Sequence, residues 1–217
     1  MTTARVTPAR RGRPGYDLES LLAVAVAAFN ERGYEATSME DLSRRLGITK
    51  SAIYHHVASK DELLRLAVGR ALDGLFEAAA QAAALDGRAI DRLHHLVRRS
   101  VHVLVERLPF VTLLLRVRGN TEVEREALAR RREFDHLVGE LFQRAEAEGD
   151  VRADVPPAVA ARLVFGLVNS LVEWYRPGGG MDAGALADTV VAMAFQGLRT
   201  TPRGAGGQVV AETTEPW

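Results

Sequence analysis

The feature that most restricts the fold is a pair of short amphipathic segments separated by a glycine. Residues 39–46 have apolar side chains three or four positions apart, which is the spacing of one helix face, and Gly47 is suited to end that helix. After a turn, a second short helix is predicted over residues 50–56, with Ile53 and Val57 on its buried side. Two helices of this length joined by a glycine-containing turn have the dimensions of a helix-turn-helix. The apolar residues of the first segment are Met39, Leu42 and Leu46.

Helix start and stop signals surround this pair. Helical periodicity begins at Asp17, and Gly33 is expected to end the first helix because glycine adopts the left-handed conformation most easily. The run 37–40 (Thr-Ser-Met-Glu) has the form of a capping box with Thr37 as the cap. The run 59–62 (Ser-Lys-Asp-Glu) repeats this form and opens a long helix. Three short helices followed by a long one are therefore expected to form a compact unit.

An ordered set of residues between positions 18 and 66 carries more information than any of these signals alone. The residues of the set are Phe29, Gly33, Tyr34, Thr37, Leu42, Leu46, Gly47, Ile48, Thr49, Ile53, Tyr54, His55, His56 and Lys60. In this order and at this spacing, residues 18–66 resemble the DNA-binding domain of the TetR family of bacterial regulators. Val57 departs from the family, which usually has Phe there, and this implies a slightly different packing of the recognition helix.

The resemblance implies that residues 50–56 form a recognition helix that enters the major groove of DNA. A helix in this groove presents its first turns to base edges, and Thr49, Lys50 and Ser51 occupy that end. The small side chain of Ser51 permits a close approach to the bases, and His55 is expected to face a base as well. Adjacent histidines are, on the other hand, often no more than exposed polar residues.

Five further side chains are expected to hold phosphates without reading sequence. Lys60 lies at the N-terminus of the long helix, where backbone amides and a cation together suit a phosphate. Thr37 and Ser38 have the same opportunity one helix earlier. Tyr54 and His56 are expected to donate to the DNA backbone. Taken singly, Tyr54 is also consistent with the core, and a capping box has no functional weight by itself.

The distribution of charge adds a second indication of DNA binding. Basic and acidic residues number 28 each, so the formal net charge is zero. Residues 1–15 nevertheless carry four arginines and no acid, and they are expected to form a flexible arm that raises the affinity for DNA electrostatically. Within the arm, Arg11-Gly12-Arg13-Pro14 is similar to the core of an AT-hook, which fits a narrow minor groove. A plain basic tail explains the same residues.

The remainder of the chain is predicted to be helical, which gives an all-α fold. After the arm of 1–15, we expect a helix-turn-helix domain over 16–65, a larger helical domain over 66–201 and a disordered tail over 202–217. In the family, the larger domain binds a ligand and forms the dimer. Prolines that a first helical turn tolerates and glycines that stop helices mark the boundaries. The predicted helices of this domain span 89–106, 109–117, 121–148, 156–175 and 182–199.

The last two predicted helices are expected to form the interface of a homodimer. The resemblance implies a four-helix interface built from this pair, although the same apolar stripes would also serve packing within one subunit. A dimer is favoured because one short recognition helix gives limited affinity and two half-sites multiply it. The expected partner is therefore a palindromic operator in double-stranded DNA. The predicted interface residues are Leu163, Leu167, Leu171, Leu186, Val190 and Met193.

The position of a small-molecule site is the least constrained part of the prediction. Arg116 and Arg118 lie near a predicted turn, where they suit a carboxylate, a phosphate or a coenzyme A-type ligand, or surface pairs with Glu122 and Glu124. The apolar candidates are each equally consistent with the hydrophobic core. The predicted pocket residues are Leu96, Val103, Phe110, Leu114, Arg116, Arg118, Phe134 and Leu137.

Several classes of protein are disfavoured. The chain contains no cysteine, which removes disulfides and thiolate metal sites and fits a reducing cytoplasm. No apolar run is long enough to span a bilayer, and no apolar core of a secretory signal follows the first arginines. His95 and His102 share a helix face while His136 lies on another helix, so no metal site is expected. The motifs of P-loop, dinucleotide, α/β-hydrolase and zinc-protease sites are missing, and neither an enzyme nor a cofactor is predicted.

These observations predict a ligand-responsive, DNA-binding transcriptional regulator, specifically a repressor that a small molecule releases from its operator. The alternative is an activator or an architectural DNA-binding protein without an effector. A closed core between residues 89 and 148 would favour the alternative, whereas a cavity of ligand size would oppose it. In a ligand-responsive repressor, the long helix from Lys60 is the expected lever between effector and recognition helix.

Overall fold

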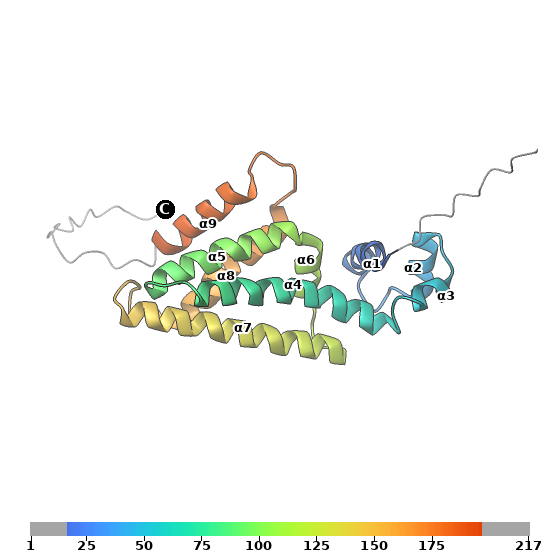
Figure 1. The fold of residues 1–217 in the computed structure, drawn as a ribbon, viewed down its shortest axis with the longest axis horizontal. Helices are drawn as coiled ribbons and strands as arrows, with labels where there is room; N and C mark the ends of the chain where they lie inside the picture. Colours follow the sequence, from blue (N-terminus) through green and yellow to red (C-terminus); the bar gives the residue numbers. More distant parts are fainter. Residues whose placement is uncertain (1–16, 197–217) are drawn as a thin grey trace, which may run out of the picture.

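The computed structural model describes residues 17–196, which form nine α-helices and contain no β-strand within that range. Figure 1 shows α1, α2 and α3 gathered at one end, with α4 running from them into a bundle made by the other helices. The all-α fold predicted from the sequence is confirmed. The helices are α1 (Leu18–Arg32), α2 (Met39–Leu46), α3 (Lys50–Tyr54), α4 (Lys60–Ala83), α5 (Ala89–Glu106), α6 (Leu108–Arg116), α7 (Glu122–Ala147), α8 (Pro157–Trp174) and α9 (Ala183–Gln196).

The predicted boundaries agree closely with these helices. The range of α5 is the predicted one, and each end of α6, α7 and α8 lies one residue from its predicted position. The recognition helix α3 is shorter than predicted, because it ends at Tyr54 and the two histidines form the turn that follows. The predicted arm with its Arg-Gly-Arg-Pro run, the predicted tail and the last three residues predicted for α9 lie outside the described residues.

An aromatic pair joins α1 to the loop before α2. Asp17 caps α1 by accepting a hydrogen bond from the amide of Ser20 at 2.8 Å, and Gly33 ends the helix with a φ of +89°. The apolar face of α1 is buried, and the ring of Phe29 meets that of Tyr34 edge to face with the centroids 5.2 Å apart. The helix and the loop after it are therefore held by the core that they form.

The cap of α2 differs from the prediction by one residue. Ser38 is the cap: its hydroxyl oxygen accepts from the amide of Asp41 at 3.1 Å, and the Asp41 carboxylate accepts from the amide of Ser38 at 3.0 Å. Thr37 is buried instead, and its hydroxyl donates to the carbonyl of Gly33 at 2.8 Å. The predicted box from Thr37 to Glu40 was wrong because the helix begins one residue later, where Ser38 and Asp41 satisfy each other's amides, while Thr37 closes the preceding loop.

The Ser38–Asp41 cap makes the stability depend on pH. Hydrogen bonds from Ser38, together with Arg44, lower the pKa of Asp41 from 3.8 to about 2. Since the pKa is lower in the folded protein, the stabilisation is present above the unfolded pKa and is lost as the pH falls from about 4 to about 2. We expect Asp41→Asn to remove this part of the acid-induced decrease in the urea midpoint. Glu40→Gln, an acid outside the cap, is the control, and identical acid profiles for Asp41→Asn and the wild type would contradict the prediction.

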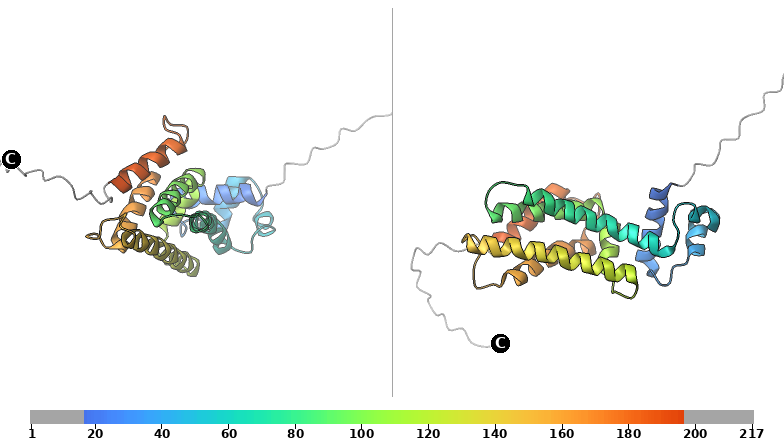
Figure 2. Two further views of the ribbon diagram at one scale, coloured as in Figure 1. Left: turned by 60° about the vertical axis from the view of Figure 1, so that its left-hand side comes forward. Right: turned by 60° about the horizontal axis from the view of Figure 1, so that its bottom comes forward.

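One continuous helix, α4, connects the two parts of the molecule. Its first turns pack on α1, and the rest packs on α5, α6 and α7. α8 lies on α7 and α5, and α9 lies mainly on α5. The second view of Figure 2 shows α4 and α7 side by side along the bundle. A displacement of α4 within the bundle is therefore transmitted along one helix to α1, α2 and α3.

Gly74 marks a close approach between α4 and α5. A Cβ atom at this position would lie 2.8 Å from both Val103 Cγ1 and Arg107 Nη1. The guanidinium of Arg107 is itself fixed, because it donates to the carbonyl of Arg70 at 2.6 Å. Val103 is buried and β-branched, so its side chain has little freedom to move aside.

We expect Gly74→Ala to lower the free energy of unfolding by about 1–2 kcal/mol, because the overpacking outweighs the helix propensity that alanine gains over glycine. Gly69→Ala on the same helix is the matched control. Nothing lies within 4 Å of a Cβ atom there, so this variant should be as stable as the wild type or more stable. Urea denaturation measures both, and equal stability of the two variants would show that the contact at Gly74 yields without cost.

Candidate nucleic-acid interface and effector cavity

The turn before α3 directs the first residues of that helix outward. Gly47 adopts a φ of +65°, and Thr49 caps α3 by accepting a hydrogen bond from an amide of its first turn at 3.2 Å. Ile53 is fully buried, so it fixes how α3 is rotated on the core. As a consequence, Thr49, Lys50 and Ser51 are exposed at the leading end of the helix.

The other end of α3 carries an exposed aromatic side chain. Tyr54 is 45% exposed, which excludes the core alternative, and Lys50 Nζ lies 5.9 Å from the centroid of its ring. A cation over an aromatic face is weakly attracted to it, so the two side chains favour one common orientation. Seven of the nine predicted DNA-contacting side chains are exposed: Ser38, Thr49, Lys50, Ser51, Tyr54, His55 and His56.

The remaining two, Thr37 and Lys60, are held by the protein itself. Thr37 is 1% exposed with its hydroxyl bonded inside the loop, so the prediction that this side chain holds a phosphate was wrong. Lys60 is half-buried: its ammonium donates to the carbonyl of Tyr34 at 3.0 Å and lies 4.2 Å from the centroid of that ring. The Tyr34 hydroxyl donates to Asp61, and burial raises the pKa of Tyr34. An ammonium group has three N–H donors, so Lys60 retains two for a phosphate.

Polar contacts also join α1 to α4 and α6. Asn30 at the end of α1 donates to the carbonyl of Pro109 at 2.8 Å, and the Asn30 carbonyl accepts from Arg116 at 2.6 Å. On the other side, Arg70 of α4 forms an ion pair with Glu19 of α1. The orientation of α1, and with it that of the recognition helix, therefore depends on both α4 and α6.

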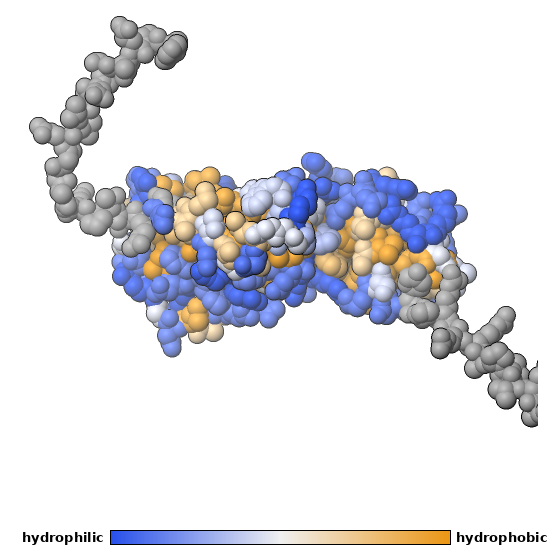
Figure 3. All heavy atoms as spheres, turned by 90° about the horizontal axis from the view of Figure 1, so that it is seen from above, coloured by the Kyte–Doolittle hydropathy of each residue, from blue (hydrophilic) through white to orange (hydrophobic). Residues whose placement is uncertain are grey.

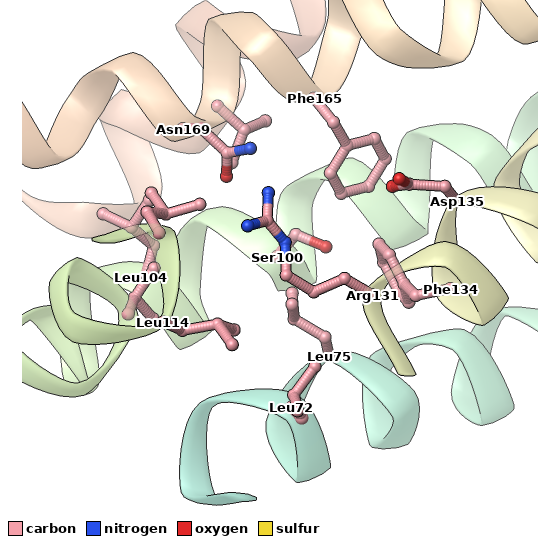
Figure 4. Close-up of a pocket in the computed structure, with 13 residues that line it drawn as sticks. Leu72, Leu75, Ser100, Leu104, Leu114, Arg131, Phe134, Asp135, Phe165 and Asn169 are labelled. Carbon is pink, nitrogen blue, oxygen red and sulfur yellow. The ribbon is translucent and has the colours of Figure 1, made fainter. Parts of the chain in front are cut away.

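A small cavity lies inside the larger domain, where α4, α5, α6, α7 and α8 meet (Figure 4). Its free volume is about 30 Å³, which is room for about two water molecules. A ligand larger than water therefore requires the cavity to widen. The apolar wall includes Leu72, Leu75, Leu104, Leu114, Phe134 and Phe165.

Four polar side chains interrupt this apolar wall, and none of them was predicted from the sequence. Ser100 is fully buried, and its hydroxyl has no hydrogen-bond partner among the described residues. Arg131 from α7 and Asn169 from α8 point into the cavity in Figure 4. Desolvation raises the pKa of Asp135, against the opposing effect of Arg131 and Arg162. The sequence contains one signal for this polar site: Ser100 is a hydroxyl residue among the apolar residues of the buried face of α5.

The predicted apolar pocket residues do not lie together. Leu114 and Phe134 line the cavity of Figure 4. Leu96 and Leu137 line a separate groove of about 290 Å³ between α4, α5 and α7. The sequence therefore placed the candidates on suitable helices without indicating which space each one faces.

The other predicted pocket residues lie outside both spaces. Arg116 and Arg118 line a depression of about 350 Å³ between α1 and α6. Among the described ion pairs none joins them to Glu124, which is buried and accepts hydrogen bonds from two backbone amides at 3.0 and 2.6 Å. Val103 packs at the α4–α5 contact, and Phe110 lies with its ring centroid 5.3 Å from the guanidinium carbon of an arginine on α4.

α8 is apolar on two sides, one buried and one exposed. Its outward side leaves Val159, Leu163 and Trp174 exposed, and Met193 of α9 is exposed as well. Figure 3 views the molecule from the side on which α9 lies in Figure 1, and apolar residues gather on the surface of the larger domain there. This exposed apolar face is where a second protein surface would bury the most apolar area.

Three of the six predicted interface residues face the interior of their own subunit. Leu171, Leu186 and Val190 are between 1% and 4% exposed, so they cannot contact a second copy, and their prediction was wrong. Helical periodicity identifies an apolar stripe but not whether the stripe points into the subunit or out of it. The predicted interface residues that remain at the surface are Leu163, Leu167 and Met193.

Two other kinds of site are absent from residues 17–196. No group of histidine, aspartate and glutamate side chains in this range is placed to hold a metal ion. Every helix of this range is too short or too polar to span a lipid bilayer.

An exposed recognition helix, a long helix leading from it and a helical domain with an internal cavity together define a helix-turn-helix transcriptional regulator. Comparison with known families agrees. Residues 21–67 match the family described as bacterial regulatory proteins, tetR family, and residues 86–198 match the tetracyclin repressor-like C-terminal domain. The chain belongs to the TetR family. The predicted function, a ligand-responsive transcriptional repressor, is confirmed at the level of this family, which is a class of regulators and not of enzymes.

Relatives match over both domains. The structure of SCO3833, a TetR-family member from Streptomyces coelicolor A3, has a TM-score of 0.78 at 57% identity and covers 84% of this chain and 92% of that one. The transcriptional repressor KstR2 of Rhodococcus jostii is 29% identical over 206 residues, which are 86% of this chain and 93% of KstR2. AibR, whose structure contains isovaleryl coenzyme A and operator DNA, has a TM-score of 0.69 at 27% identity over 82% of this chain and 97% of AibR.

Proposed function

We propose that this protein represses transcription in the bacterial cytoplasm as a homodimer that binds a palindromic operator and is released by a small-molecule effector. The observation that carries the proposal is the exposed leading end of α3. Thr49, Lys50 and Ser51 are free to meet base edges while Ile53 holds the helix on the core. The repressor KstR2 and the operator complex of AibR with isovaleryl coenzyme A support the same function.

The side chains divide the work of binding. A major-groove helix reads bases with its leading turns and is positioned by phosphate contacts from its flanks. Only the exposed side chains and the two spare donors of Lys60 are available for these contacts. Bases are read by Thr49, Lys50, Ser51 and His55, and phosphates are held by Ser38, Tyr54, His56 and Lys60.

The dimer forms through the outward sides of α8 and α9. Leu163 and Met193 are 65% and 66% exposed, and exposed apolar side chains that gather on one surface mark a site of protein–protein contact. Gly166 lies on the same outward side of α8, and nothing occupies the space within 4 Å of a Cβ atom there, so a second helix can approach closely. Two copies related by a two-fold axis then present two recognition helices to successive half-sites.

Release follows from the position of the cavity beside α4. Leu72 and Leu75 of α4 line it, and Arg70, on the same helix, holds Glu19 of α1. An effector that widens the cavity displaces this part of α4 and so changes the orientation of α1 and the recognition helix. A coupling of about 1–3 kcal/mol between effector and DNA is typical of such transitions.

Selection from random double-stranded DNA with the full-length protein tests this function. The enriched sequences should contain an inverted repeat whose half-site centres lie about one helical turn, or a multiple of it, apart. A promoter that overlaps this repeat should be repressed in a purified transcription reaction when the protein is added. Enrichment of no sequence, or of a single unrepeated site, would refute the dimeric repressor.

A further inference from the structure

We propose that the effector carries a carboxylate on a compact apolar body, and that Arg131 pairs with this carboxylate inside the cavity of Figure 4. The inference rests on the proposed function in one respect, namely that the effector binds in this cavity. It adds the chemical class of the effector and the side chain that recognises it.

The first observation is a hydroxyl group without a partner. Ser100 is fully buried on α5, and its oxygen makes no hydrogen bond within the described residues. Buried polar groups in native proteins nearly always have a partner, and an orphaned one calls for an explanation. The Ser100 side chain lines the cavity, so a polar atom of a bound ligand would supply the missing partner.

The second observation is a cation directed at the same place. Figure 4 shows the guanidinium of Arg131 between Ser100, Asn169 and Leu114, while the carboxylate of Asp135 lies beside Phe165. None of the ion pairs within residues 17–196 includes Arg131, and Asp135, which lines the same cavity, acts on it only as a nearby charge. A planar guanidinium binds a carboxylate with two parallel hydrogen bonds. This bidentate ion pair is one of the strongest polar contacts that an arginine side chain can make.

The donors and acceptors around Arg131 complete a head-group site. Ser100 and Asn169 come from α5 and α8, on two sides of the guanidinium that α7 supplies. A hydroxyl and an amide N–H both donate well to carboxylate oxygens. A neutral head group would satisfy Ser100 and Asn169 but would leave Arg131 without an ion-pair partner at contact distance.

The rest of the wall defines the body of the ligand. Leucines from α4, α5 and α6 and the rings of Phe134 and Phe165 surround the head-group site, so the remainder of the ligand is apolar. With a free volume of about 30 Å³, the cavity admits a ligand only if it widens, and α4 is one of the helices that form its wall. A compact ligand minimises that displacement, and the displacement itself acts on α4, the helix that leads to the recognition helix.

The groove at Leu137 offers the nearest competing arrangement. It is wider, about 290 Å³, and Arg92 and Arg144 line it beside apolar side chains. It lies on the surface between three helices, and although the Nε of Arg92 is buried there without a hydrogen-bond partner, Glu140 also lines the groove, so a carboxylate of the protein already shares this space with the two arginines. Arg144→Met is therefore the matched control for Arg131→Met, since each variant replaces one arginine of α7 that lines a space between helices.

The test measures ligand binding by thermal unfolding and by calorimetric titration of the full-length protein. The probes are straight-chain monocarboxylates of four to ten carbons and cyclohexanecarboxylate, each compared with its amide and its coenzyme A thioester. At least one carboxylate should raise the melting temperature and bind at least about tenfold more tightly than its amide, because the charge-assisted bonds to Arg131 are lost in the amide. Arg131→Met should abolish this preference, Arg131→Lys should keep part of it, and Arg144→Met should leave it intact.

The outcomes separate this inference from the proposed function. Equal binding of carboxylate and amide, tighter binding of the thioesters without dependence on Arg131, loss of the preference in Arg144→Met, or binding of no probe would each overturn the inference. If a carboxylate binds through Arg131 but leaves the operator complex intact, the ligand class stands and ligand-induced release fails. The melting temperatures of the unliganded variants, compared with the wild type, show whether each variant is folded.

Discussion

Replacing Leu163 with arginine is expected to convert the dimer to a monomer and to weaken operator binding by about 10²- to 10⁴-fold. Leu163 is 65% exposed on the outward side of α8, so the proposed dimer buries it against the second copy. A charge at this position would be desolvated without a partner, which costs more than the remaining packing returns. Each recognition helix would then bind its half-site alone. Sedimentation velocity measures the assembly, and fluorescence anisotropy with the selected operator measures the affinity.

Leu85→Arg is the matched control for this substitution. Leu85 is also an exposed leucine, at 37%, but it follows the end of α4 and lies on neither α8 nor α9. This variant should remain dimeric, bind the operator and unfold like the wild type. Leu163→Arg should still unfold cooperatively, since Leu163 is exposed within its own subunit, but at a lower temperature because the dimer no longer stabilises the folded state. A dimeric Leu163→Arg protein would place the interface elsewhere.

The small domain was predictable because its signals are local. Gly33 and Gly47 end helices at positive φ, and the side chains spaced along each short helix are the ones that the core buries. Ile53 and Val57 are both buried, as predicted, although Val57 is smaller than the residue usual in the family. In helices of one to four turns, spacing and caps leave little choice of which face turns inward.

For the helices of the larger domain, local signals do not predict which apolar face is buried. α8 has apolar side chains on two faces, and the sequence gives no reason to assign Leu163 to the outside and Leu171 to the inside. That difference depends on the angle at which α8 crosses α7 and α5, which is set by packing among helices distant in sequence. A similar ambiguity on a smaller scale explains Thr37 and Ser38, two adjacent hydroxyl residues of which only the second caps α2.

The polar site in the cavity was missed for a related reason. Ser100, Arg131 and Asn169 lie on three different helices, and no two of them are close in sequence. Arginine and asparagine on a helix are ordinarily surface residues, so neither has a local pattern that marks it as part of a site. The sequence analysis instead assigned the ligand to Arg116 and Arg118, which are close in sequence. In the structure, Arg116 donates a hydrogen bond to the carbonyl of a residue in α1.

Tyr54→Ala is expected to weaken operator binding at least about 30-fold, since each lost contact costs roughly 1–3 kcal/mol and the dimer loses two. The free energy of unfolding should stay within about 0.5 kcal/mol of the wild-type value, because the side chain is exposed and its loss opens no cavity. Lys50→Ala should also weaken binding, and it should reduce the slope of log K against log salt by about two per dimer if each ammonium meets a phosphate. If Lys50 reads a base instead, the slope changes less and the discrimination between operator and mutated operator falls.

A single cation removed far from the recognition helix separates local contacts from net charge. Arg132→Ala on α7 is exposed and changes the charge of the chain as Lys50→Ala does, so it should leave the affinity and the salt dependence nearly unchanged. Wild-type operator affinity in both Tyr54→Ala and Lys50→Ala would mean that α3 does not enter the groove by its exposed face. Since Ile53 is fully buried, no other face of this helix is available to DNA, and the mode of binding itself would then have to be a different one.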